Sequence, residues 1–439
     1  MSQSPLCANV MTETVVALVP LENLVSNHPF RPLRHRSVLL IWGAGVISDT
    51  GTWIQLVVVG SLVAANTGSA LQTGLIALAT FMPQGIAAPV GGLLADRFDR
   101  SRVFVGGLAG QALFTTGLAI LLGLGVRTPI VLAALIMCAS AMGSIGGPAY
   151  AAMLPDLVPP EELMAMSSLG IYSWNAGRIV GPLVGTVLAE SAGPAWTVAI
   201  NAATFAGLAL AVLALRRRFI PHDTEPGSIR VRLVQGWMAA RTIRSCVFAI
   251  AAVTVLNLFV GPFMGLIPAY VHEAFHGGVG LVGVFSSLQG AGAILGTLLV
   301  TGFSPRFGRS RIMVVVAALL VVSYISYALA PSAAFAAICV VGLGACSAST
   351  FTTMMYIVQR DAPHAQRGRV LSILQALVGF SYGIGILSLG VVGDAYGLRV
   401  AFGLSAGMVA VMIVLLVRRL PDWRNSIDHG SARVALGVT

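Results

Sequence analysis

The chain has 439 residues, of which 56% are hydrophobic and 10% are charged, and its mean hydropathy is +0.88. This composition excludes an ordinary soluble domain of this length. The formal net charge of +10 comes from 26 arginines without any lysine, so the chain has neither a P-loop lysine for ATP nor a Schiff-base lysine for retinal.

Twelve apolar stretches follow one another along the chain, each long enough to cross a bilayer, which takes about 20 helical residues. They fall into two sets of six, separated by a segment that carries seven arginines. We therefore predict an all-α polytopic membrane protein with twelve transmembrane helices in two six-helix pseudo-repeats. The predicted spans are 37–64, 71–95, 103–123, 129–154, 164–190, 195–215, 246–271, 280–302, 312–330, 332–358, 370–393 and 398–417.

The same pattern predicts the domain organisation and the orientation. We expect a mostly disordered N-terminal tail at 1–36, a first half at 37–215, a linker at 216–245, a second half at 246–417 and a C-terminal tail at 418–439. Positive charge in short loops stays on the cytoplasmic side. With both tails and the linker in the cytoplasm, 23 of the 26 arginines lie there, which predicts a multi-pass protein of the cell membrane. The positive charge thus sets the orientation in the membrane, and we expect no nucleic-acid partner.

An internal duplication is visible in two short basic runs. Residues 96–102 read Asp-Arg-Phe-Asp-Arg-Ser-Arg, and residues 305–311 read Pro-Arg-Phe-Gly-Arg-Ser-Arg, at an offset of 209. Further along, Glu190 aligns with Asp394 at an offset of 204. Two diverged halves explain both offsets, and repeated halves around a central site are typical of secondary transporters.

The first basic run also belongs to a longer motif. Residues 92–97 read Gly-Leu-Leu-Ala-Asp-Arg, and this stretch, followed by Arg100 and Arg102, resembles the signature between helices 2 and 3 of the major facilitator superfamily. It departs from that signature at Asp99, where the family usually has glycine, and at Ser101, where it usually has a base. The stretches 67–70 and 175–182 extend the resemblance to bacterial exporters of the enterobactin-exporter and drug-efflux type.

The resemblance implies that this motif is a conformational latch, formed by Gly92, Asp96, Arg97, Arg100 and Arg102. In the family the acid bridges to the start of helix 11, here near Arg369 and Val370, when the inner side is closed. A carboxylate at a helix N-terminus accepts backbone hydrogen bonds and is stabilised by the helix dipole. The alternative is a solvated turn that serves only as a topology signal.

A glycine ridge is predicted in the fifth span. Gly177, Gly181 and Gly185 recur every four residues beside Pro182, and such a smooth face lets a neighbouring helix pack closely. The stretch resembles the G-x-x-x-G-P-x-x-G-G signature of antiporters in the family, although Thr186 replaces the last glycine. It supports antiport, and ordinary helix packing is the alternative.

Two charged residues within spans are the strongest functional candidates. A charge at the centre of a membrane helix costs about 2.5–3.5 kcal/mol on insertion scales, so such residues are rare without a function. Asp49 and Arg178 each lie about halfway along a span, where they could pair or share a water-filled cavity. We predict that they couple transport to protons; a static ion pair is the alternative. Proton-coupled relatives often carry an arginine in helix 4, which is absent here, so Arg178 would replace it from helix 5.

Polar and aromatic residues in other spans are candidates for the wall of a substrate cavity. Each of them could instead contribute only to helix packing. The candidates are Trp53, Trp174, Asn175, Asn257, Gln289, Tyr356, Gln375 and Tyr382.

These features together predict a secondary active transporter that exports a small, partly apolar molecule, such as a drug, a siderophore or another metabolite, by proton antiport and alternating access. Its expected partners are the substrate, protons and the lipid bilayer, and we expect a functional monomer. Uptake by symport is one alternative, and a non-transporting receptor or scaffold is another, which the buried charges disfavour. We expect no enzyme, metal or cofactor, because all seven histidines fall in loops, tails or span ends.

Overall fold

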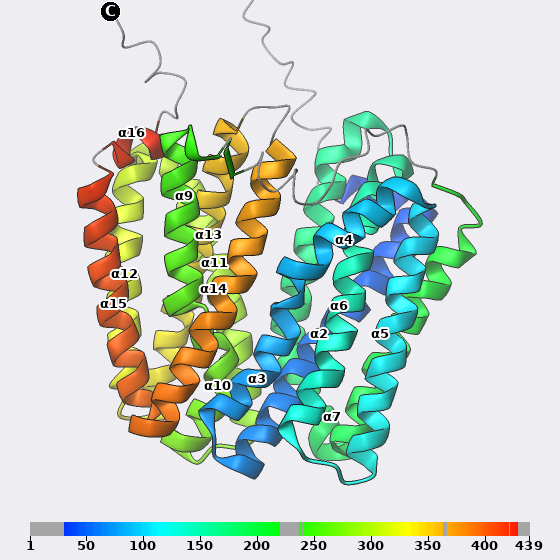
Figure 1. Ribbon diagram of the computed structural model, residues 1–439, viewed down its shortest axis with the longest axis horizontal. Coiled ribbons are helices and arrows are strands. Elements are labelled where there is room, and N and C mark those ends of the chain that lie inside the picture. Colours follow the sequence, from blue (N-terminus) through cyan, green and yellow to red (C-terminus); the bar gives the residue numbers. More distant parts are fainter. Residues whose placement is uncertain (1–29, 220–236, 239, 363–366, 421, 429–439) are drawn as a thin grey trace, which may run out of the picture.

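The computed structural model describes residues 30–219, 237–238, 240–362, 367–420 and 422–428, and this part of the chain is all-α (Figure 1). It contains 11 helical segments that are long and apolar enough to cross a membrane. The longest, Pro160–Ala214, contains two passes, because Gly193 interrupts the helix with a φ of 83° just before Pro194. Only glycine adopts this left-handed conformation without strain. The described residues therefore make twelve passes, as the sequence predicts.

Six of these passes form the first half. One pass consists of two helices, because Pro83 has no N–H with which to continue the hydrogen-bond ladder after Phe81. Short 3₁₀ helices precede the first and fifth passes. The elements are η1 (Arg31–Arg34), α2 (Arg36–Thr67), α3 (Ala70–Phe81), α4 (Pro83–Arg97), α5 (Arg100–Gly123), α6 (Pro129–Met153), η2 (Leu154–Leu157), η3 (Pro160–Glu162) and α7 (Leu163–Ala214).

The other six passes form the second half, and a short helix follows them. The seventh pass contains a π-helical turn before Pro262, where the carbonyl of Phe259 accepts side-chain hydrogen bonds from Tyr324 at 3.1 Å and Ser405 at 2.7 Å. π-Turns of this kind are frequent at functional sites. The elements are α9 (Arg244–Val255), η4 (Leu256–Val260), α10 (Pro262–Phe275), α11 (Val279–Phe307), α12 (Arg309–Ala328), α13 (Ala333–Asp361), α14 (Arg367–Tyr396), α15 (Leu398–Arg419) and α16 (Trp423–Asp428).

The two arms of α7 run in opposite directions along α2. In the first arm Gly177 approaches Asp49 and Gly185 approaches Ile54, so this arm runs parallel to α2. In the second arm the side-chain amide of Asn201 donates to Gln55 at 2.8 Å, and later residues of this arm lie beside the start of α2. The chain therefore reverses at Gly193.

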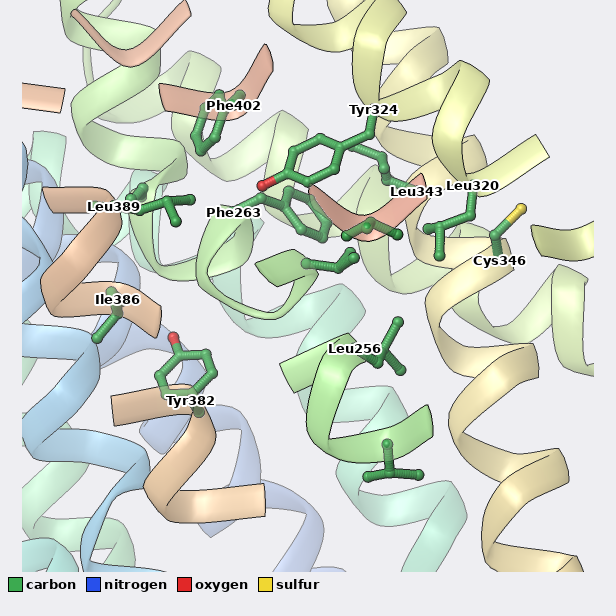
Figure 2. Packing of buried hydrophobic residues seen from close by; sticks show 14 of the residues in the cluster. Leu256, Phe263, Leu320, Tyr324, Leu343, Cys346, Tyr382, Ile386, Leu389 and Phe402 are labelled. Atoms are coloured by element: carbon green, nitrogen blue, oxygen red, sulfur yellow. The ribbon is translucent and has the colours of Figure 1, made fainter. Parts of the chain in front are cut away.

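Buried aliphatic and aromatic side chains form the core of the second half (Figure 2). Phe263, Tyr324 and Phe402 lie together, and the hydroxyl of Tyr270 donates to the carbonyl of Tyr327 at 2.6 Å. Buried hydroxyls need such partners, because an unpaired polar group in an apolar interior costs free energy. The core thus combines apolar packing with buried hydrogen bonds, although the hydroxyl of Tyr327 has no partner among the described residues.

The two halves stand side by side, with α7 against α11, α14 against α3 and α4, and α10 against α2 and α3 (Figure 1). We call the end that carries Arg100, Arg309, Arg360 and α16 the arginine-rich end, and the opposite end the arginine-poor end. The ribbons of the halves diverge towards the arginine-rich end. The predicted linker at 216–245 falls largely outside the described residues.

An acidic segment at the arginine-rich end is neutralised from another part of the chain. Glu162 in η3 is only 3% exposed and contacts Arg31, Arg34 and His35, which precede α2, at 3.2, 2.6 and 3.1 Å. Asp156 nearby lies 3.6 Å from Arg100. The loop between the fourth and fifth passes has no arginine of its own and thus receives its positive charges from neighbouring segments.

Candidate functional site

Asp49 lies where α2 and α7 approach most closely. Gly177 permits this approach, since a Cβ on it would lie 2.9 Å from the backbone carbon of Asp49. Ser173 lies one turn earlier on the same face of α7, and its hydroxyl donates to Oδ2 of Asp49. A hydroxyl in this place satisfies one lone pair of a carboxylate that apolar helices surround. The glycine ridge therefore brings the hydrogen-bond partner of Asp49 within reach.

Arg178 follows Gly177 and so lies at the same depth as Asp49, but its contacts are in the other half. Its Nε donates to Oε1 of Gln289 on α11 at 2.9 Å, and its Nη2 lies 3.8 Å from the sulfur of Met264 on α10. Its guanidinium carbon lies 5.7 Å from the ring centre of Trp53, within cation–π range. Among the described residues, Asp49 and Arg178 form no ion pair with each other. They are neighbours with separate partners.

Four aromatic residues form a chain beside Arg178, which we call the aromatic cluster: Trp53 on α2, Phe81 on α3, Trp174 on α7 and Tyr382 on α14. The ring of Trp53 lies 5.3 Å from Trp174 and 6.2 Å from Phe81, and Phe81 lies 5.4 Å from Tyr382. Trp53, inside this chain, is 4% exposed, and Tyr382, at one end of it, is 5% exposed, whereas Trp174, at the other end, is partly buried. The cluster therefore joins the two halves through apolar surface.

Two donors in the aromatic cluster lack a protein partner. Within the described part of the chain, Nε1 of Trp53 and the hydroxyl of Tyr382 are buried and make no hydrogen bond. Figure 2 shows Tyr382 one turn from Ile386 on α14. Most buried polar groups are paired, so a buried donor without a protein partner indicates a site for water or a ligand.

A cavity between the halves lies beside these donors. Its wall comes from α2, α3, α10 and α11, and it includes Gly265, next to which the Tyr382 hydroxyl lies. Apolar walls with a few convergent polar groups are typical of small-molecule sites. In this conformation the cavity has a volume of only about 20 Å³, room for a water molecule, so a drug-sized substrate would need the halves to move apart. The lining residues are Trp53, Leu56, Val57, Gly60, Thr73, Ile76, Ala77, Met264, Gly265, Pro268, Ser286 and Gln289.

Four other cavity candidates have different surroundings. The side-chain amides of Asn175 and Asn257 donate to carbonyls of their own helices, Ile171 and Val253, both at 2.9 Å. Gln375 is exposed. The ring of Tyr356 lies at the arginine-rich end, 4.4 Å from the guanidinium carbon of Arg309 and 5.5 Å from that of Arg360.

The glycine ridge itself lies against α2. A Cβ on Gly181 would lie 2.8 Å from the carbonyl oxygen of Thr50 and from Cβ of Trp53, and a Cβ on Gly185 would lie 3.2 Å from Cα of Ile54. The hydroxyl of Thr186 has one proton to share between two carbonyl oxygens, that of Pro182 at 3.0 Å and that of Val279, in the other half, at 3.1 Å. Thr186, which departs from the antiporter signature, thus contacts the second half.

The predicted latch motif lies at the arginine-rich end. Arg97 and Arg102 are exposed, and Gly92 has open space where a Cβ would be. Arg100 donates to the carbonyl of Ala152 at 3.0 Å. Asp96 lies in the last turn of α4, which packs against α14, but its predicted partner Arg369 has a side chain outside the described residues.

Asp99 caps the next helix, α5. Its Oδ1 accepts the backbone N–H of Ser101 at 3.0 Å and the Ser101 hydroxyl at 2.7 Å, and the N–H of Phe219 lies at 3.3 Å. Burial acts to raise the pKa of Asp99, but these hydrogen bonds and the nearby Arg102 lower it below its ordinary value. Asp99 is therefore a structural carboxylate that favours its charged form.

Sequence reasoning missed three residues of this region: Ser173, Phe81 and Met264. Serine, phenylalanine and methionine are common in apolar helices and give no signal by type alone. Ser173 could have been found from its position, since it precedes the glycine ridge by one turn of the same face. Phe81 and Met264 come from other helices, and only the packing of the halves brings them near Trp53 and Arg178.

Comparisons with known proteins agree with this architecture. A family model described as transmembrane secretion effector matches residues 27–435. The chain is 28% identical to the multidrug efflux pump Tap of Mycobacterium tuberculosis over 88% of this chain and 93% of that protein. It is 24% identical to macrolide efflux protein A of Streptococcus pyogenes, over 85% and 94%. A single-residue variant of the nucleoside transporter NupG has the same fold, with a TM-score of 0.71, 15% identity and coverage of 87% and 99%.

Proposed function

Because the chain belongs to the transmembrane secretion effector family of the major facilitator superfamily, we propose that it exports a small, partly apolar molecule from the cytoplasm in exchange for protons. Its similarity to proteins named multidrug efflux pump Tap and macrolide efflux protein A supports the direction and the substrate class. The protein is a transporter and not an enzyme, as its family indicates. It acts as a multi-pass membrane protein.

The observation that carries the proposal is the position of Arg178 between the halves. It extends from α7 to Gln289 on α11, beside Trp53 and the cavity. A guanidinium that contacts both halves depends on their relative position, because moving one half changes its partners. Substrate bound at this place would couple to the same movement. Rocking of the halves around the cavity would then expose it to each side in turn.

The substrate chemistry follows from the cavity wall. The aromatic cluster offers flat apolar surface, and the unpartnered donors of Trp53 and Tyr382 offer two hydrogen bonds to acceptors. A ligand that satisfies these donors removes the cost of leaving them unpaired. We therefore expect a substrate with an apolar body and at least one oxygen or nitrogen acceptor.

Asp49 is the proposed proton carrier. Its described partner is the neutral hydroxyl of Ser173, so a proton can bind the carboxylate without breaking an ion pair. Protonation removes a charge from an apolar span, and deprotonation restores it. Access to Asp49 from opposite sides in the two conformations would make each proton entering the cell accompany one conformational cycle. Because Asp49 and Arg178 lie at the same depth, protonation of the carboxylate and substrate binding beside Arg178 would both depend on the position of the halves.

The orientation belongs to this proposal as well. The arginine-rich end faces the cytoplasm, with both termini on that side, because positive loops are retained there. Asp96 and its basic neighbours would hold this end when it is closed, as the family resemblance implies. One chain supplies both halves of the cavity, and we propose a functional monomer in the lipid bilayer.

The test is accumulation of dyes and toxic compounds in efflux-deficient bacterial cells that express the wild type or Asp49→Asn. We expect lower accumulation with the wild type only, and only while the proton gradient stands. Asp422→Asn, which removes an exposed carboxylate paired with Arg244, is the matched control and should behave as the wild type. Transport by Asp49→Asn that remains sensitive to an uncoupler would refute the role of Asp49. Higher accumulation with the wild type would instead support uptake by symport.

A further inference from the structure

The arginine-poor end holds a contact between the halves that the transport proposal does not use. Asp394 lies in the last turns of α14, in the second half, and its carboxylate reaches the start of α3, in the first half. Its Oδ1 accepts the backbone N–H of Ala70 at 2.6 Å, and its Oδ2 accepts the hydroxyl of Ser69 at 2.7 Å. The N–H of Leu71 lies 3.4 Å from both oxygens. One side chain thus bridges the halves.

The chemistry of this contact favours a carboxylate. The first amides of a helix have no partner within the helix, and the positive end of the helix dipole attracts an anion. Ser69 already caps α3, since its hydroxyl oxygen accepts the N–H of Gln72 at 3.1 Å, and its own proton remains for Asp394. Because Asp394 is exposed to solvent, water can replace these bonds at a modest cost. This suits a contact that must form and break.

Two glycines let α14 come close enough. A Cβ on Gly390 would lie 2.7 Å from Cα of Leu71, and a Cβ on Gly393 would lie 3.0 Å from Cβ of Ala70. Any larger side chain at either position would push the helices apart. The approach that places the Asp394 carboxylate on the α3 terminus is therefore built into this face of α14.

The internal repeat places a second acid at the corresponding position. Glu190 aligns with Asp394, and Gly280 aligns with Leu71 at the 209-residue offset of the basic runs. In the structure Glu190 ends the first arm of α7, and its Oε1 lies 3.4 Å from the point that a Cβ on Gly280, in the first turn of α11, would occupy. Each half thus presents an acid near the end of one helix to the start of a helix in the other half.

We propose that Asp394 is the latch that holds the arginine-poor end closed, and that its release from the start of α3 is required for the central cavity to open there. The same pass that begins with α3 ends with Asp96, whose implied partner is the opposite end of α14. The acid at the end of α14 would then bind the start of α3 at the arginine-poor end. The acid at the end of α4 would bind the start of α14 at the arginine-rich end. Forming one contact while breaking the other alternates access. The inference rests on the proposed function for its place in transport, whereas closure itself can be measured without substrate.

The experiment measures access to the cavity from the arginine-poor side. Ser286→Cys places a thiol on the cavity wall, and a membrane-impermeant maleimide added to intact cells reports its exposure. The same chain without this change measures background labelling of the native cysteines. We expect Asp394→Ala to raise the labelling rate at least about fivefold, since it removes charge-assisted hydrogen bonds that stabilise the closed state. Asp394→Asn, which keeps the shape, should give a smaller rise.

Two further variants separate opening from misfolding and from a general loss of charge. A cysteine at Ile136, which is 1% exposed within the first half, should stay unlabelled in the Asp394→Ala chain. Glu190→Gln shows whether the repeat-related acid contributes equally. Unchanged labelling of Ser286→Cys after Asp394→Ala overturns the latch. Labelling at Ile136 as well also overturns it, because the change would then unfold the half and not open a gate. Neither result bears on the role of Asp49, which the accumulation test decides separately.

Discussion

Arg178 and Gln289 form a hydrogen bond across the two halves, from Nε on α7 to Oε1 on α11, at 2.9 Å. Gln289 is 2% exposed, so water does not readily replace it. A hydrogen bond to a charged group contributes about 1.5–3 kcal/mol. The bond therefore favours the conformation seen here over conformations in which the halves have moved.

Gln289→Leu should shift this conformational balance. The leucine keeps a similar volume but leaves Nε of Arg178 without its acceptor, and a loss of about 1.5 kcal/mol corresponds to a roughly tenfold change in the equilibrium. Transport rates of a coupled substrate in proteoliposomes should fall accordingly.

Asn175→Ala is the matched control for this change. Asn175 lies three residues before Arg178 on α7, and its side-chain amide donates to the carbonyl of Ile171 in its own helix. We therefore expect a transport rate close to that of the wild type. Equal rates for Gln289→Leu and the wild type would show that the bond has no part in the cycle.

Tyr382→Phe removes one unpartnered donor and keeps the ring that packs on Phe81. If the hydroxyl binds substrate, the dissociation constant should rise about three- to tenfold, the range for one lost hydrogen bond of about 1 kcal/mol. Binding can be followed by tryptophan fluorescence, because Trp53 and Trp174 lie in the same cluster. A variant that binds as tightly as the wild type, with equal or higher thermal stability, would mean that the hydroxyl faces no ligand.

The close packing of α2 on α7 predicts a strong effect at Gly181. In Gly181→Ala the new Cβ would lie 2.8 Å from the carbonyl oxygen of Thr50, which cannot rotate away, so the helices must separate. Overpacking of this kind costs about 1–3 kcal/mol. We expect a fall of several degrees in the apparent melting temperature in detergent.

Gly170→Ala on the same helix is the matched control for Gly181→Ala. No atom lies within 4 Å of the Cβ that it would add, and alanine favours the helix more than glycine does. Its melting temperature should therefore stay the same or rise slightly. Similar falls for both variants would mean that the loss comes from helix propensity and not from contact with α2.

Much of the fold could be predicted from the sequence, because membrane spans are long, apolar and bounded by charge. The twelve passes and the break between 190 and 195, at Gly193, follow from these signals. The depth of Asp49 and Arg178 could also be predicted, since a constant rise per residue sets it. Whether the two charges pair could not, because side-chain direction depends on how α7 rotates against α2 and α11.

The cavity was harder to predict than the fold for a related physical reason. Asn175 and Asn257 are polar residues in spans, yet each satisfies its amide with the preceding turn of its own helix, so polarity alone does not mark a cavity wall. Tyr356 lies close to an end of its span, where guanidinium groups surround it. Met264 and Phe81, in contrast, look like ordinary apolar residues and become part of the site only through contacts between distant helices.

The ion pairs of Glu162 at the arginine-rich end should contribute to stability. Its carboxylate is 3% exposed, but its partners Arg31 and Arg34 are 38% and 53% exposed, so solvent screens each pair. Arg34→Ala should therefore lower stability by no more than about 1 kcal/mol. Glu162→Ala removes the shared partner of Arg31, Arg34 and His35 and should lower it more. Melting curves of both variants check this order, and the reverse order would contradict the clustered arrangement.

Asp99, where the latch motif departs from the family signature, has a functional counterpart in the second half. Gly308 stands where Asp99 would be repeated, and Ser310 corresponds to Ser101. In the first half Asp99 accepts both the N–H and the hydroxyl of Ser101. In the second half Asp428 on α16 does the same for Ser310, at 2.8 and 2.6 Å.

α16 therefore supplies from the C-terminal region the cap that Asp99 supplies locally. Asp428→Ala should loosen α16, leaving it held by Arg360, which donates to the carbonyls of Ser426 and Ile427. Trypsin cleavage after the exposed Arg424 should then be about fivefold faster, because proteolysis of a folded segment follows its local opening. Asp99→Ala disturbs the equivalent cap in the other half and should leave this rate unchanged. Faster cleavage with Asp99→Ala alone would mean that α16 responds to the stability of the whole molecule and not to its own carboxylate.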